Sequence, residues 1–244
     1  MGQEVVTLDA GVSFVSFEGL RIGYSRGTAV KSLGPVFNIT LSNLTVANTG
    51  AGGIGLVGSG IEIDNCEVFG TAAFGITIKG GKRDTLERSG NVVSGCEVHH
   101  TSRLFRTGQP GLHWVGVGNT FRDNHVHDMP HYAMMGGANQ ATCTSESGWG
   151  RPPYVPDDLG ICGSDENLFE GNVIENAVYE CDDSGSFNTC GQEGTAFTNR
   201  GNVLRGNRFR NIRMQPTNDD GSGVLVGGVS KNDEFCIKNE ELCI

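Results

Sequence analysis

Apolar and polar residues alternate over short stretches of this chain, and one arrangement of them recurs seven times. Each copy spans twelve residues, and the copies begin at positions 14, 38, 60, 90, 118, 166 and 201. The fourth and ninth residues of every copy are apolar, as in Phe121 with Val126 and Leu204 with Phe209. Successive starts fall within the period of about 20 to 50 residues that is typical of solenoids, so each copy is expected to be one coil.

The segments within each copy have the pattern of strands. Residues 38–46 read NITLSNLTV, an alternation with a period of two. Gly and Asn separate such segments, and the 38 glycines of the chain allow a turn every few residues. No stretch keeps apolar residues at helical spacing for ten residues. We therefore expect an all-β fold, a right-handed parallel β-helix of about seven coils, forming one domain over residues 1–244 with a loop insertion at about 136–163.

The seventh position of each copy predicts ladders of like residues inside the solenoid. In chain order it is occupied by Leu20, Leu44, Cys66, Cys96, Asn124, Asn172 and Asn207. Coils stack about 4.8 Å apart, so each residue would lie on its counterpart. An amide both donates and accepts, so the three asparagines are expected to bond from coil to coil; alternatively, they are ordinary turn residues. The two cysteines are expected to be buried thiols or one inter-coil disulfide.

Composition limits the classes of function. With 244 residues and 37% hydrophobic content, the chain can bury a core as one domain. Its net charge is −10 and its 18 Lys and Arg residues are scattered, so we do not expect a nucleic-acid partner. No segment approaches the roughly 20 apolar residues of a membrane span, and no signal peptide is recognisable at the start. The missing terminal cap of the solenoid indicates a fragment of a longer protein.

Six cysteines outside the repeat suggest an oxidising compartment. They form near pairs in sequence, Cys143 with Cys162, Cys181 with Cys190, and Cys236 with Cys243. Disulfides often fix long loops in secreted proteins, so we expect an extracellular or secreted location. The sequons at Asn38 and Asn43 agree with it. Because no pair has Cys-x-x-Cys spacing, neither a metal nor another cofactor is expected.

Candidate chemistry lies beyond the repeat and in its largest insertion. The insertion contains GWGRPPYVPDDLG, in which Trp149 and Tyr154 could stack on a sugar ring or simply pack the loop. Counted from the copies that start at 118, 166 and 201, His131 has offset 13, Glu180 and Asp183 have offsets 14 and 17, and Asp219 and Asp220 have offsets 18 and 19. Stacking would make residues at similar offsets neighbours, so these acidic groups would converge beside one histidine.

Paired carboxylates on neighbouring coils suit the hydrolysis of glycosidic bonds. One carboxyl group must stay protonated to donate to the leaving oxygen, while the other stays charged. Crowding the two raises one pKa, because like charges at close range cannot both ionise cheaply. A separation of about 5 Å gives retention and roughly 6.5 to 9.5 Å gives inversion. The other interpretation of the DDSG and DDGSG segments is that they are only turns.

The segments NHVHDMPHYAMMGGAN, ENLFEGNVIENAVYECDDSGSFNTCG and NDDGSG resemble the pectin-lyase superfamily of right-handed β-helix proteins. More narrowly, they are similar to glycoside hydrolase family 141 and its relatives. The resemblance implies a catalytic pair made of Asp183 with Asp219 or Asp220. The expected ligand is then a polysaccharide or oligosaccharide. The candidate substrate-binding residues are His131, Tyr132, Glu180, Asp182, Trp149 and Tyr154.

Two alternatives remain open. A polysaccharide lyase of the same superfamily would hold Ca²⁺ with Asp182, Asp183, Asp219 and Asp220. An Arg would be its base, although no basic residue lies at a matched offset and an acidic protein repels polyuronates. The third possibility is a non-catalytic solenoid that binds glycans or has a structural role, because β-helices carry many functions.

Overall fold

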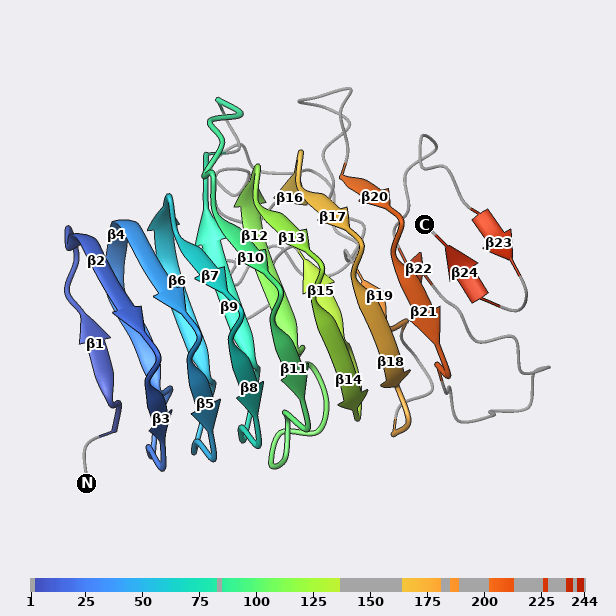
Figure 1. Ribbon diagram of the computed structural model, residues 1–244, viewed down its shortest axis with the longest axis horizontal. Coiled ribbons are helices and arrows are strands. Elements are labelled where there is room, and N and C mark those ends of the chain that lie inside the picture. The colour runs from blue at the N-terminus through green and yellow to red at the C-terminus, as the bar shows by residue number, and fades with distance from the viewer. Residues whose placement is uncertain are drawn as a thin grey trace, which may run out of the picture.

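The computed structural model describes residues 3–82, 85–136, 164–180, 185–188 and 202–212, together with the backbone of strands at 226–227, 236–238 and 241–243. Its strands stack side by side along one axis, from the N-terminal end to the C-terminal end (Figure 1). Among the described residues, no helix has the length and apolar character needed to cross a membrane.

Each coil is built from three strands, and the twelve-residue repeat supplies two of them. The first strands are β2 Ser13–Glu18, the second part of β4 Val30–Ser42, β7 Glu62–Asp64, β10 Val92–Ser94, β13 Thr120–Arg122, β17 Leu168–Glu170 and β20 Val203–Arg205. The second strands are β3 Arg21–Gly23, β5 Thr45–Ala47, β8 Glu67–Phe69, β11 Glu97–His99, β14 His125–Met129, β18 Val173–Ala177 and β21 Arg208–Arg210. The third strands are β1 Val6–Leu8, the first part of β4, β6 Ile54–Ser59, β9 Ile76–Gly80, β12 Leu112–Val117, β15 Met134–Gly136, β19 Phe187–Asn188 and β22 Val226–Gly227.

The three sets of strands form two sheets. First and third strands share a fifteen-stranded sheet, because β4 runs through both sets, and the second strands belong to a nine-stranded sheet. Successive coils pair in parallel throughout, which confirms the predicted all-β, parallel β-helix. Strand β16 Ser164–Asp165 also pairs in parallel with β12. Strand β24 Glu241–Cys243 departs from the parallel arrangement and pairs antiparallel with β21 and with β23 Cys236–Lys238.

The register between coils is the one that the repeat predicts. At the fourth position Ile63 pairs with Val93, which pairs with Phe121. At the ninth position Val98 pairs with Val126. All five side chains are fully buried. Since side chains alternate between the two faces of a strand, the eighth and tenth positions must then point outward.

Left-handed backbone at fixed positions turns the chain at the corners of each coil. The sixth residue has a φ between 50° and 66° in all seven copies, and the eleventh has a φ between 48° and 62°. Gly, Asn and Asp tolerate this conformation best, which explains why they recur at these positions. His100 and Asp128 also adopt it at the eleventh position, with φ of 49° and 53°.

The predicted asparagine ladder is present. Asn124 Nδ2 donates to Asn172 Oδ1 over 2.9 Å, and Asn172 Nδ2 donates to Asn207 Oδ1 over 2.9 Å. Backbone N–H groups of Asn124 and Asn172 donate to the same oxygens. A second ladder, which was not predicted, runs along the second position of the repeat and consists of Asn91, Asn119, Asn167 and Asn202. Both ladders are buried.

The apolar part of the same corner differs from the prediction in two respects. Cys66 and Cys96 are free thiols, so the alternative of an inter-coil disulfide is wrong. Leu44 is buried, but Leu20 is 45% exposed because β3 is the end strand of its sheet. Cysteines 143, 162, 181 and 190 lie outside the described residues, as does most of the predicted insertion.

Candidate functional site

Three of the predicted site residues lie within the described structure, and they come from consecutive coils. His131 and Tyr132 follow β14, and Glu180 follows β18. The two loops are joined through their backbones, because Glu180 N donates to Pro130 O over 3.0 Å and Val178 N donates to His131 O over 3.2 Å. The remaining predicted residues, Trp149, Tyr154, Asp182, Asp183, Asp219 and Asp220, lie outside the described residues.

Arg106, from the loop after β11, joins this group and was not predicted. Its Nε donates to Glu180 Oε2 over 2.6 Å, and its Nη2 also contacts Glu180 Oε1. The two-point hydrogen bond with Arg106 lowers the pKa of Glu180, and the same bond raises the pKa of Arg106. Glu180 therefore stays ionised and suits binding better than proton donation. We call Arg106, His131, Tyr132 and Glu180 the loop edge.

The imidazole of His131 is fixed in place. Its side chain is buried, and its Nδ1 accepts a hydrogen bond from Gly108 N over 2.8 Å. Accepting at Nδ1 leaves the proton of the neutral ring on Nε2. The ring of Tyr132 packs on it, with centroids 3.8 Å apart. Loops from three consecutive coils thus meet here, those of His131 and Glu180 at offsets of 13 and 14 and that of Arg106 at an offset of 16.

A second group of ionisable residues lies on the outer face of the nine-stranded sheet. It contains His99, His100, His125 and His127, which we call the histidine strip. His99 and His127 pair in register on β11 and β14, and their rings stack 4.8 Å apart with an angle of 6°. Phe69, at the same position on β8, stacks on His99 at 5.0 Å. The strip is therefore a stack of outward tenth-position side chains, flanked by histidines at the eighth and eleventh positions.

Carboxylates surround the strip. His99 Nε2 lies 3.5 Å from Glu67 Oε1, and His125 Nε2 lies 3.5 Å from Glu175 Oε2. Burial lowers the pKa of His99, and the neighbouring His127 lowers it further, so this ring is uncharged near neutral pH.

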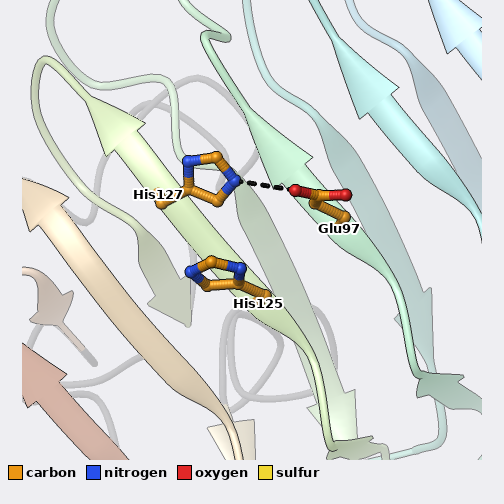
Figure 2. Close-up of side chains that lie close together, drawn as sticks. All are labelled: Glu97, His125 and His127. Atoms are coloured by element: carbon orange, nitrogen blue, oxygen red, sulfur yellow. Dashed lines mark hydrogen bonds and ion pairs between the residues drawn. The ribbon is translucent and has the colours of Figure 1, made fainter.

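One part of the strip has the geometry of a metal site. Glu97, His125 and His127 each offer a ligand atom, and the three atoms lie within 4.8 Å of one another. Figure 2 shows the two rings side by side on β14, with the carboxylate of Glu97 facing His127. The expectation of no metal rested on the spacing of the cysteines, and none of these three residues is a cysteine. The sequence did contain a sign of this group. Positions eight to ten read EVH at 97–99 in one copy and HVH at 125–127 in the next, so their outward side chains are neighbours.

Comparison with known proteins agrees with this architecture. Residues 5–147 match the family model described as right handed beta helix region. The match covers more than half of the chain, which therefore belongs to this family of right-handed β-helix proteins. No curated protein and no solved structure matches the chain significantly. The narrower resemblance to glycoside hydrolase family 141 rests on the motifs alone and stays a prediction.

Proposed function

We propose that this protein acts on carbohydrate, and that it is a glycoside hydrolase whose glycan lies along the loop edge. The observation that carries the proposal is the meeting of His131 and Glu180. These two residues lie on different coils and far apart in sequence, yet their loops are joined by backbone hydrogen bonds. Both residues were predicted from their offsets within the repeat. Because their loops do meet, the same use of offsets is supported for the aspartates.

The loop edge offers the groups that sugar binding uses. The Glu180 carboxylate, kept charged by Arg106, can accept hydrogen bonds from hydroxyl groups, and the guanidinium retains donors for ring or glycosidic oxygens. Tyr132 adds an aromatic ring beside the fixed imidazole of His131. Convergent polar groups beside an aromatic surface are typical of small-molecule binding sites.

In this proposal the reaction itself belongs to the aspartates. Asp183 and either Asp219 or Asp220 supply the acid and the nucleophile or base, and their proximity would raise the pKa of the acid. Glu180 would help to orient the sugar without donating a proton, since its own pKa is lowered.

The test is release of reducing ends from a panel of plant and algal polysaccharides. Wild type would be compared with Asp183→Asn, Asp219→Asn and Asp220→Asn, each with and without chelator. Asp9→Asn is the matched control, because Asp9 is an exposed acid in the first coil. We expect Asp183→Asn and one of the other two to reduce turnover at least about 100-fold, with no effect of chelator and no effect of Asp9→Asn.

Other outcomes separate the alternatives. Products with unsaturated, ultraviolet-absorbing ends, lost on chelation, would show a calcium-dependent lyase instead. Glycan binding without release from any substrate would show a binding solenoid. Release that survives all three aspartate substitutions would contradict the assigned catalytic pair.

A further inference from the structure

We propose that Glu97, His125 and His127 form a binding site for a divalent transition-metal ion on the outer face of the nine-stranded sheet. This site is separate from the loop edge, and glycoside hydrolysis by paired aspartates does not require it. The proposal therefore stands or falls independently of the proposed function.

The strands hold the three side chains on one face. His125 and His127 are two residues apart on β14, so both point outward, while Val126 between them is fully buried. Glu97 lies directly opposite His125 in the register between β11 and β14. Burial of Val126 in the core prevents β14 from rotating, so the arrangement is a rigid consequence of the coil stacking.

The distances are close to those of a bound ion. Two ligands of a tetrahedral zinc ion, each about 2.1 Å from it, lie about 3.4 Å apart. The Nε2 atom of His127 and the Oε1 atom of Glu97 are 3.1 Å apart, and all three ligand atoms lie within 4.8 Å. Small side-chain rotations of exposed groups would complete the site, because the side chains of Glu97 and His125 are 51% and 42% exposed.

A second observation points to the same ligand atoms. The other nitrogen of His127, Nδ1, lies 2.8 Å from Asp128 Oδ2, and Asp128 Oδ1 accepts a hydrogen bond from Asn176 Nδ2 over 3.2 Å. Metal-binding histidines usually donate their second N–H to a carboxylate in this way, which fixes the tautomer and leaves the opposite nitrogen for the ion. Here that opposite nitrogen is Nε2, which faces Glu97.

The hydrogen bonds of Asp128 and the stacking of His99 reinforce this arrangement. The Asp128 carboxylate is held from two sides, by Nδ1 of His127 and by Nδ2 of Asn176. His99 lies parallel to His127 and restrains its ring plane.

The donor atoms select the class of metal. Two imidazole nitrogens and one carboxylate oxygen suit Zn²⁺, Co²⁺, Ni²⁺ or Cu²⁺, whereas Ca²⁺ and Mg²⁺ require sites made of oxygen atoms. Because the site faces solvent, water would fill the remaining coordination positions. Glu175 is a possible further ligand, since its Oε2 lies 3.5 Å from Nε2 of His125.

The experiment is isothermal titration calorimetry of Zn²⁺ and of Ca²⁺ into the full, untagged, metal-stripped chain. We expect one strongly bound Zn²⁺ ion and no binding of Ca²⁺ at this site. His127→Gln and Glu97→Gln should weaken Zn²⁺ binding at least about 10-fold, and Asp128→Asn should weaken it about 10- to 100-fold by releasing the ring. Circular dichroism of each variant would check that the fold is retained, as we expect because these side chains point outward and are not part of the core.

Glu67→Gln is the matched control. Glu67 occupies the same outward position one coil earlier, in register with Glu97, and lies beside His99 instead of His127. Its substitution should leave Zn²⁺ affinity within about twofold of wild type. The absorption spectrum of bound Co²⁺ gives a second readout, because nitrogen and oxygen ligands produce only weak visible bands. Intense thiolate charge-transfer bands, no binding, or equal affinity in His127→Gln and wild type would overturn the proposal.

Discussion

The early and late coils of this solenoid fill the same inner corner in different ways. In the early coils the seventh position holds Leu44, Cys66 and Cys96, and the Leu44 N–H donates only to the weak acceptor Cys66 Sγ, at 3.4 Å. In the late coils it holds asparagines, whose amides bond along the stack and to backbone carbonyls. The backbone of the coil is thus compatible with either apolar packing or a polar ladder.

The apolar columns change over the same part of the chain. Aliphatic residues such as Ile54 and Ile78 fill the early coils, whereas Trp114, Phe169 and Phe187 meet in the late ones, with the Trp114 and Phe169 ring centroids 4.4 Å apart. The loop edge and the histidine strip begin on the coil that starts at residue 90, which still has a cysteine at this corner, and continue onto the coils with asparagine there. These outer polar groups therefore lie across the boundary between the two kinds of core.

Breaking the ladder should have the largest effect. Asn172→Leu removes the acceptor of both Asn124 N and Asn124 Nδ2, and it leaves Phe121 O without its side-chain donor. Each buried group without a partner costs about 1 to 3 kcal/mol, so we expect a loss of about 4 kcal/mol of unfolding free energy. Urea unfolding followed by circular dichroism would measure it. A loss below about 1 kcal/mol would show that the ladder is not needed for stability.

A smaller effect is expected where an aromatic ring covers a glycine. A Cβ on Gly136 would lie 2.0 Å from Trp114 Cε2, and one on Gly52 would lie 2.2 Å from Phe74 Cε2. Trp114 is fully buried and cannot move, whereas Phe74 is half-buried and can rotate. Gly136→Ala should therefore cost about 1 to 3 kcal/mol, and Gly52→Ala less. Thermal melting of both variants would test the order, and the reverse order would contradict it.

The smallest change should come from extending the ladder into the early coils. The Cys96 N–H already donates to Asn124 Oδ1, and the Cys66 N–H donates to Cys96 Sγ. In Cys96→Asn the new amide would therefore find an acceptor in Asn124 Oδ1, and its own oxygen would accept from the Cys66 N–H. We expect a change within about 1 kcal/mol, although a polar group enters the core. The control Val98→Asn, two residues further along the core, offers no such partners and should cost about 1 to 3 kcal/mol. Equal losses in the two variants, measured by urea unfolding, would refute the idea.

The sequence predicted two of the three strands in each coil, with their register. The third strand was not predicted, because it lies beyond the twelve residues of the repeat. It was nevertheless regular, since Val30, Ile54, Ile76 and Met134 all have offset 16 from the start of a copy. The spacing fails at Leu112, which has offset 22 from the copy that starts at 90. The longer loop responsible for this shift carries Arg106.

The site was predictable only in part, for a related reason. His131 and Glu180 were found because they carry suitable chemistry at similar offsets. Arg106 has no offset in common with them, so only the folded loop brings it to Glu180. Glu97 and His127 belong to successive copies, and their proximity becomes visible only when the columns of the repeat are read across coils.

One corner of the coil never changes length. Between the first and second strands there are always two residues, the sixth and seventh of each copy, as at 65–66, 95–96 and 171–172. Every insertion within the described chain enters at one of the other two corners, as at 100–111 and 81–91. New peptides or whole domains could therefore be grafted at the two variable corners without shifting the stack. A single residue added at the constant corner would move every later side chain out of register.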